Sequence, residues 1–169
     1  MKLSHQLWNT NIQNEKYYGH SNMCPICQLA PESPTHVYKC SHPAAATHRK
    51  EALSSFSTSL TGSTPPVLQE VLLSGLTQWI CTDCPSTIQA STEGSRLPPL
   101  RAITAAFKSQ TTLGWDSLHR GHIVSQWKDA YKLNYRPKKQ LTQQQMETAS
   151  DKWSRLLITA IWTYSERLW

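Results

Sequence analysis

Apolar residues recur at helical spacing along most of the chain, and no segment of any length alternates apolar and polar residues as a strand would. Helices are predicted over 44–60, 67–80, 100–111, 115–135 and from about 143 to the end. Their expected inward-facing residues are Ala45, Ala52, Leu53, Phe56, Leu60, Leu68, Val71, Leu72, Leu76, Trp79, Leu100, Ile103, Ala106, Phe107, Trp115, Leu118, His122, Trp127, Tyr131, Met146, Ala149, Trp153, Leu156, Leu157, Ala160, Ile161 and Tyr164. The pattern predicts a mostly α fold, an irregular bundle of about four to five helices with little or no sheet beyond a tiny hairpin.

Three regions differ in character. Residues 1–22 predict a short helix over "KLSHQLW" and a turn-rich linker, residues 23–42 hold cysteine and histidine, and residues 43–169 form the helical region. A stretch of low apolar content near 82–99 predicts a mobile loop. The last predicted helix meets no Gly or Pro stop signal before Trp169, so we expect a chain truncated at its C-terminus, a fragment of something longer.

Composition and charge narrow the class of protein. The 169 residues are 38% hydrophobic and 17% charged, with a formal net charge of +6 and a pI of about 9.2. A basic balance favours an anionic partner, of which nucleic acid is the commonest. No secretory signal and no apolar run long enough for a bilayer is present, and five cysteines are an odd number for a disulfide framework. We expect an intracellular protein, nuclear or cytoplasmic and not secreted, with no membrane partner.

The segment "MCPICQLAPESPTHVYKCSH" carries the clearest chemical signal. Cys24 and Cys27 form a Cys-x2-Cys turn, and His36 and Cys40 follow four residues apart, on one face if "PTHVYKC" is helical. Zinc prefers four such ligands in a tetrahedron. With all four positions filled by protein and no carboxylate, the site is closed and structural, holding one Zn ion. The bland alternative is a set of free thiols with a surface histidine.

Other ligand sets stay open. His42 or His48 could replace a ligand, and His20 is a remote alternative. Cys81 and Cys84 form a weaker Cys-x2-Cys pair that His119 and His122 could complete. The competing interpretation places Cys81 at a helix end and Cys84 in the loop.

Residues 23–42, called the knuckle below, resemble the zinc-binding module that lies C-terminal to the polymerase domain in non-LTR retrotransposon reverse-transcriptase-like proteins. The matching pattern is Cys24, Pro25, Cys27, Glu32, Ser33, His36, Val37, Tyr38 and Cys40. "LGW" at 113–115 and the Trp-rich last helix are loosely similar to such tails. The resemblance implies a nucleic-acid-binding accessory, and a parent polymerase domain as partner if the chain is a fragment.

Catalytic signatures are missing from the sequence. A polymerase needs clustered aspartates for two metal ions, but Asp83, Asp116, Asp129 and Asp151 are scattered. No Ser lies in a Gly-x-Ser-x-Gly setting. We expect no catalytic residue, no small-molecule substrate and no enzyme activity, so a hydrolase is the weakest hypothesis.

The basic residues are unevenly spread. Residues 96–139 hold nine Lys or Arg and two Asp, a net charge of +7, interleaved with Trp127, Tyr131 and Tyr135. Such a segment suits phosphate contact with base stacking, or equally a solvated helical face with its aromatic rings in the core. The candidate phosphate contacts are Lys39, Arg49, Lys50, Arg120, Lys128, Lys132, Arg136, Lys138 and Lys139.

Two classes of function therefore lead. The first is a non-catalytic, zinc-stabilised module that binds nucleic acid, RNA or single-stranded DNA. The second is a zinc-organised protein-interaction module that docks a partner through the knuckle and the Trp-rich helices. A retroelement remnant with no function is a further alternative.

Overall fold

The computed structural model describes residues 10–82, 85, 98–137 and 139–168 and confirms the mostly helical fold. Its elements are α1 (Asn11–Tyr18), α2 (Pro34–Lys39), α3 (Pro43–Leu60), α4 (Pro66–Thr82), α5 (Pro98–Leu113), a 3-10 helix η2 (Trp115–Arg120), α6 (Gln126–Asn134) and α7 (Gln143–Leu168). In the described ranges no β-sheet occurs, and a single isolated antiparallel bridge joins Met23 to Pro31. That bridge is the tiny hairpin the sequence predicts.

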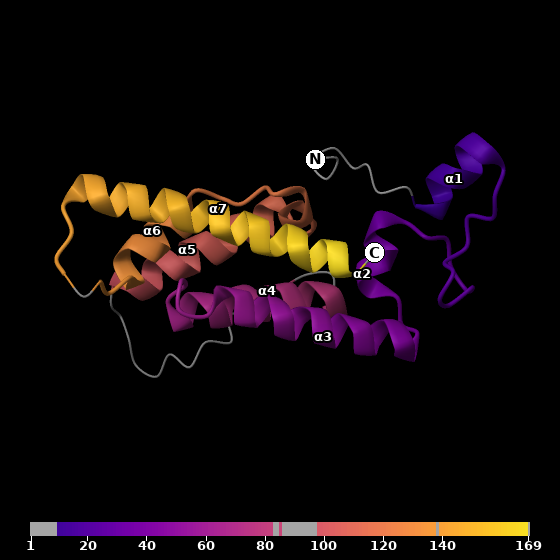
Figure 1. Cartoon of the computed structure of the whole chain (residues 1–169), viewed down its shortest axis with the longest axis horizontal. Coiled ribbons are helices and arrows are strands. Elements are labelled where there is room, and N and C mark those ends of the chain that lie inside the picture. The colour runs from indigo at the N-terminus through magenta and orange to yellow at the C-terminus, as the bar shows by residue number, and fades with distance from the viewer. Residues whose placement is uncertain (1–9, 83–84, 86–97, 138, 169) are drawn as a thin grey trace.

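The long helices α3 and α7 lie side by side, with α4, α5 and α6 packed around them (Figure 1). The C-terminal end of α7 lies beside α2, where the side chain of His48 contacts the carbonyl of Arg167. The cysteine and histidine segment therefore adjoins the bundle at the point where its first and last long helices meet.

Several helices begin with proline, whose fixed φ suits the first turn and whose missing N–H leaves no donor unsatisfied. Pro34, Pro43, Pro66 and Pro98 all stand at the first position. The predicted linker after residue 8 is wrong in one respect, because Asn11–Tyr18 is helical and ends at Gly19 with φ +69. That helix buries none of its own residues, so no apolar periodicity marks it in the sequence.

One continuous core joins α2 to α7, and it confirms the predicted inward faces with a single exception. Every residue of the predicted inward set except His122 is buried or partly buried. His122 is exposed, and His119 is buried in its place. The helix η2 ends at Arg120, and Gly121, with φ +79, turns the chain, so His122 does not continue the face that Trp115 and Leu118 occupy.

Two buried polar side chains join elements that are distant in sequence. The amide oxygen of Gln110 accepts hydrogen bonds from the indole of Trp127 at 3.3 Å and from the backbone N–H of Val124 at 3.2 Å. The hydroxyl of Thr64 accepts from the indole of Trp153 at 3.0 Å. These bonds satisfy tryptophan donors that would otherwise be buried without a partner.

Two sequence predictions lie outside the described residues. They are the helix over "KLSHQLW" and nearly all of the loop near 82–99. Among the described helices, none combines the length and the apolar character that a membrane crossing requires.

Gly75 makes room for a tryptophan. A Cβ on this buried residue of α4 would overlap the ring of Trp115, which is 1% exposed. Helix propensity alone predicts that Gly75→Ala stabilises the protein by about 1 kcal/mol. We expect the opposite, a destabilisation on the order of 1–3 kcal/mol from overpacking, measured by urea unfolding. Thr77→Ala, on the exposed side of the same helix, should change stability little; a stabilised Gly75→Ala would contradict the packing argument.

Candidate metal centre

A tight turn places the first two cysteines. The backbone N–H of Cys24 donates to the carbonyl of Ala30 at 2.8 Å, and the N–H of Gln28 donates to the carbonyl of Cys24 at 2.9 Å. Gln28 has φ +52, a left-handed conformation that reverses the chain. The N–H of Leu29 then points at Cys27 Sγ, 3.4 Å away. An N–H directed at a cysteine sulfur favours the thiolate, the form that binds metal.

Helix α2 places the other two candidates. Its N-cap is Ser33, whose hydroxyl accepts from the backbone N–H of His36 at 3.0 Å. Cys40 is the C-cap, with φ −52 and ψ 121, and it leaves the helix just after its last turn. The cap and the proline at the first position define the helix, and the helix carries His36 and Cys40 to the same side.

The structure brings all four predicted ligands together. One ligand atom from each of Cys24, Cys27, His36 and Cys40 lies within 4.8 Å of every other. Cys27 Sγ is 3.4 Å from His36 Nε2, close to the roughly 3.5 Å edge of a tetrahedron with zinc bond lengths of about 2.3 and 2.0 Å. Cys24 and Cys40 are buried, and the other two are half-buried. A set of three sulfurs and one imidazole can hold a soft divalent ion. The four ligands fill a tetrahedron and leave no coordination position of the metal open for a substrate.

The thiols differ in acidity. The pKa of Cys27 is lowered to about 6, chiefly by the hydrogen bond from the N–H of Leu29. Burial is the main cause that raises the pKa of Cys40. A thiolate at Cys27 is therefore available near neutral pH, whereas Cys40 needs a cation beside it to lose its proton.

Residues around the cluster hold its backbone in place. Arg49 of α3 donates to the carbonyl of Cys40 at 2.8 Å. The side chain of Asn11 donates to the carbonyl of Met23 at 2.8 Å, and the backbone N–H of Asn11 donates to the carboxylate of Glu32 at 2.8 Å. A carboxylate at the first turn of α1 also complements the helix dipole. Helix α1 is thus anchored to the knuckle through the residues that flank the ligands.

The residues between His36 and Cys40 attach the cluster to the bundle. The ring of Tyr38 stacks on His119 with centroids 3.7 Å apart and lies 5.8 Å from Trp79. The ammonium group of Lys39 lies 4.6 Å from the centre of the Trp79 ring. Tyr38 is buried, and burial lowers the pKa of Lys39. Residues that separate two metal ligands in sequence therefore contribute to the main core.

The alternative ligands are not part of this cluster, although His48 lines the same cavity as Cys24 and Cys40. His42 caps α3, its Nδ1 accepting from the N–H of Ala44 at 3.2 Å, and His48 contacts the carbonyl of Arg167. His20 is exposed beside Tyr18. In the described ranges the Cys24 cluster is the one group of three or more such ligands within reach of a single ion. Cys84 is not among the described residues, and Cys81 is exposed at the end of α4.

Six of the candidate phosphate contacts interact with the protein itself, and one of them, Arg136, donates to the carbonyls of Leu133 and Tyr135. Lys39 and Arg49 have the partners given above. Lys128 pairs with Asp151, and Lys132 pairs with Glu147, so two lysines of α6 meet two acids of α7. Arg120 pairs with Asp116 at 3.0 Å. The net charge of +7 counted along 96–139 is therefore partly offset by carboxylates from outside that segment.

Some of the candidates are exposed, but the aromatic residues that alternate with them in the sequence are buried or half-buried. Lys50, Arg136 and Lys139 are exposed, and Lys138 lies outside the described residues. Trp127 and Tyr131 are buried in the core, and Tyr135 is half-buried against Tyr131. The alternative in which the aromatic rings turn inward is thus the correct one for Trp127 and Tyr131.

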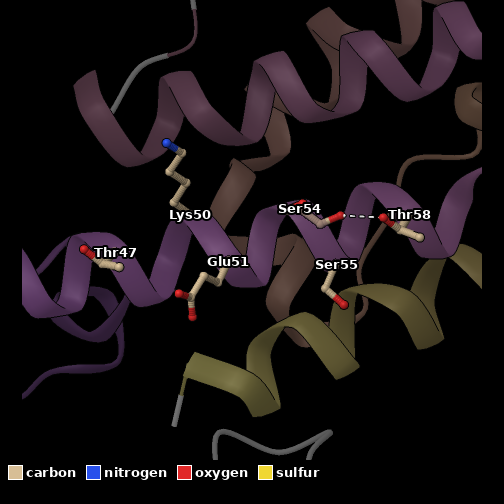
Figure 2. Close-up of a pocket in the computed structure, with 6 residues that line it drawn as sticks. All are labelled: Thr47, Lys50, Glu51, Ser54, Ser55 and Thr58. Carbon is tan, nitrogen blue, oxygen red and sulfur yellow. Dashed lines mark hydrogen bonds between the residues drawn. The ribbon is translucent and has the colours of Figure 1, made fainter.

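A shallow polar hollow of about 630 Å³ lies along α3, lined by Thr47, Lys50, Glu51, Ser54, Ser55 and Thr58 (Figure 2). The hydroxyl of Thr58 donates to the carbonyl of Ser54 at 3.0 Å, and Lys50 and Glu51 point in different directions. The hydrogen bond from Thr58 to Ser54 is the one drawn among these six residues, so neither Lys50 nor Glu51 is hydrogen-bonded to a hydroxyl of the hollow.

Comparisons with protein-family models, with curated proteins and with solved structures found no match to this chain. The retrotransposon resemblance therefore depends on the sequence motifs alone.

Proposed function

We propose that this chain is a non-catalytic module in which one structural Zn ion, held by Cys24, Cys27, His36 and Cys40, organises a surface that binds nucleic acid. The observation that carries the proposal is the convergence of these four ligand atoms within 4.8 Å. A closed set of thiolates and imidazole suits zinc, and it suits a structural role because no coordination position remains for water. The similarity to the tail of retrotransposon reverse transcriptases agrees with this function.

Charge supports the choice of partner. The chain carries a net charge of +6, and Lys50, Arg136 and Lys139 are exposed with no ion pair to any described carboxylate. Lys50 and Lys139 can meet phosphates without breaking an ion pair, and Arg136 would give up only hydrogen bonds to backbone carbonyls. Cations that contact phosphates release counterions from the nucleic acid. RNA and single-stranded DNA are the expected classes of nucleic acid.

A protein-interaction module is the second candidate, and exposed apolar groups near the knuckle favour it. Leu29 is 84% exposed and Ile26 49%, while Tyr17 and Tyr18 are 68% and 71% exposed. Tyrosines and apolar side chains of this kind form the centre of many protein interfaces. This surface would dock a partner through burial of apolar area, which salt does not weaken.

Salt dependence separates the two candidates. We expect the purified protein to bind a fluorescein-labelled 20-nucleotide RNA or DNA, measured by anisotropy, with an affinity that falls as salt rises. If four cations meet phosphates of a single strand, the slope of log K against log salt is about −3, and affinity falls roughly 50-fold between 50 and 200 mM salt. No binding at 50 mM salt would contradict the nucleic-acid function and leave the protein-interaction module.

A further inference from the structure

Two exposed cations on α5 remain outside every contact described so far. Arg101 and Lys108 are exposed, and α5 (Pro98–Leu113) contains no acidic residue. They are seven residues apart, two helical turns, so they lie on one face with a rise of about 10 Å between them. That rise is about three nucleotide steps of one strand of B-form DNA.

The surface between the two cations is a shallow depression. A hollow of about 380 Å³ is lined by Leu100, Arg101, Thr104, Ala105 and Lys108. Ala105 is exposed and short, and the hydroxyl of Thr104 donates back to the carbonyl of Leu100 at 2.9 Å. A backbone that follows this face would therefore meet small side chains between its two charged contacts.

The exposed face of α5 that carries Arg101 and Lys108, called the strip below, continues beyond α5 because α6 packs against this helix. The hydrogen bonds from Val124 and Trp127 to Gln110 hold the start of α6 against the C-terminal half of α5. The end of α6 consequently lies near the start of α5, and both are at the end of the bundle where α7 begins (Figure 1). Arg101 is in the first turn of α5, and the exposed residues Arg136 and Lys139 come shortly after the end of α6, with the Arg136 guanidinium donating to the carbonyl of Leu133 at 2.8 Å.

The neighbouring lysines of α6 make a useful contrast. Lys128 and Lys132 already meet Asp151 and Glu147 of α7, so a phosphate would have to displace a carboxylate there. Arg101 and Lys108 form no ion pair with a described residue. Phosphate contact is therefore favoured on the α5 side of the bundle.

We propose that the exposed face of α5, continued by Arg136 and Lys139, holds the phosphodiester backbone of a nucleic acid. The inference rests on the nucleic-acid function proposed above and gives it a location on α5, whose cations are not among the candidate phosphate contacts predicted from the sequence. No aromatic ring lines the hollow between Arg101 and Lys108, and Tyr135, beside Arg136, is half-buried and stacked on Tyr131. The strip consequently contacts the phosphodiester backbone and not the bases, so we expect binding to be independent of the nucleotide sequence.

Charge reversal tests the location. We expect Arg101→Glu with Lys108→Glu to weaken binding of labelled dT20 at least about tenfold at 50 mM salt and to make the salt slope shallower by about 1.4. The matched control is Lys16→Glu with Lys152→Glu, which has the same charge change on exposed residues of α1 and α7. The control should retain the salt slope of the parent.

A second pair of variants excludes misfolding as the cause. Ala105→Glu and Ala105→Gln add side chains of equal size and similar helix propensity to an exposed position, and only the first adds a negative charge. We expect Ala105→Glu to bind several-fold more weakly than Ala105→Gln. Equal affinities would show that phosphates do not pass over this face.

The same assay separates the inference from the function it rests on. If the parent binds RNA, DNA or a 20-base-pair duplex and the α5 double variant binds like the parent, the strip is wrong and the function stands. If the parent binds none of these probes, both are wrong. Comparable affinity for dT20 and dA20 supports backbone contact, and a strong preference for one of them overturns it.

Discussion

Replacing His36 with alanine should abolish stoichiometric zinc binding and unstructure the knuckle. Metal analysis of protein purified without chelator should give one zinc per parent chain and well below one for the variant. Removal of one ligand opens the tetrahedron and leaves three thiolates to repel one another. Structural zinc in small modules contributes an apparent binding free energy on the order of 10–16 kcal/mol, and that free energy is also folding free energy.

His36 is a better test position than the cysteines. Cys24 and Cys40 are buried, so replacing either would also disturb packing. The imidazole of His36 is half-buried, and its contact is Cys27 Sγ. His42→Ala is the matched control, because His42 is close in sequence, exposed and outside the cluster. We expect His42→Ala to retain one zinc.

The loss of metal should act locally at first. Amide hydrogen exchange should accelerate at Cys24 and Gln28, whose N–H groups bond within the turn, before it accelerates in the bundle. The buried residues of α3 to α7 pack on one another, and Tyr38 and Lys39 connect them to the knuckle. A folded parent without zinc would contradict the metal centre and remove the main support for the retrotransposon resemblance.

The helices and the cluster could be predicted because both are encoded locally. Leu68, Leu72 and Trp79 recur at the period of a helix and are all buried. The four metal-ligand candidates lie within seventeen residues, where a turn and one short helix suffice to bring them together. Spacing alone could not decide between His36 and His42 as a ligand, because that choice depends on where α2 ends and α3 begins.

The charged surface could not be predicted in the same way, because it depends on tertiary pairing. Lys128 and Asp151 belong to different helices and meet through the packing of α6 on α7. A count of charges along a segment cannot register a carboxylate from another segment. The exposure of His122 has a different cause, because the left-handed Gly121 ends η2 and turns the chain where the sequence predicts a continuous helix.

Acid should destabilise the bundle through His119. This side chain is buried among Tyr38, Trp79 and Tyr164, and its Nδ1 lies 3.0 Å from the hydroxyl of Ser165. Burial, with a smaller contribution from the charge of Arg120, lowers the pKa of His119 from 6.5 to about 3. Between these two values the unfolded chain binds a proton that the folded chain does not, so the free energy of unfolding falls as pH falls.

The free energy of unfolding should fall by about 1.4 kcal/mol for each pH unit below about 6.5, and the total decrease should approach about 5 kcal/mol near pH 3. Urea unfolding at several pH values should give a slope of the free energy of unfolding against pH. The slope should be flatter in His119→Phe, because phenylalanine keeps an aromatic ring against Tyr38 and cannot be protonated. Ser165→Ala is the matched control, since it removes the hydrogen bond but keeps the titrating imidazole and therefore the slope. The three proteins are identical at every other position, so the difference between slopes isolates His119. Parallel pH profiles for the parent and His119→Phe would show that this histidine does not control the acid stability of the fold.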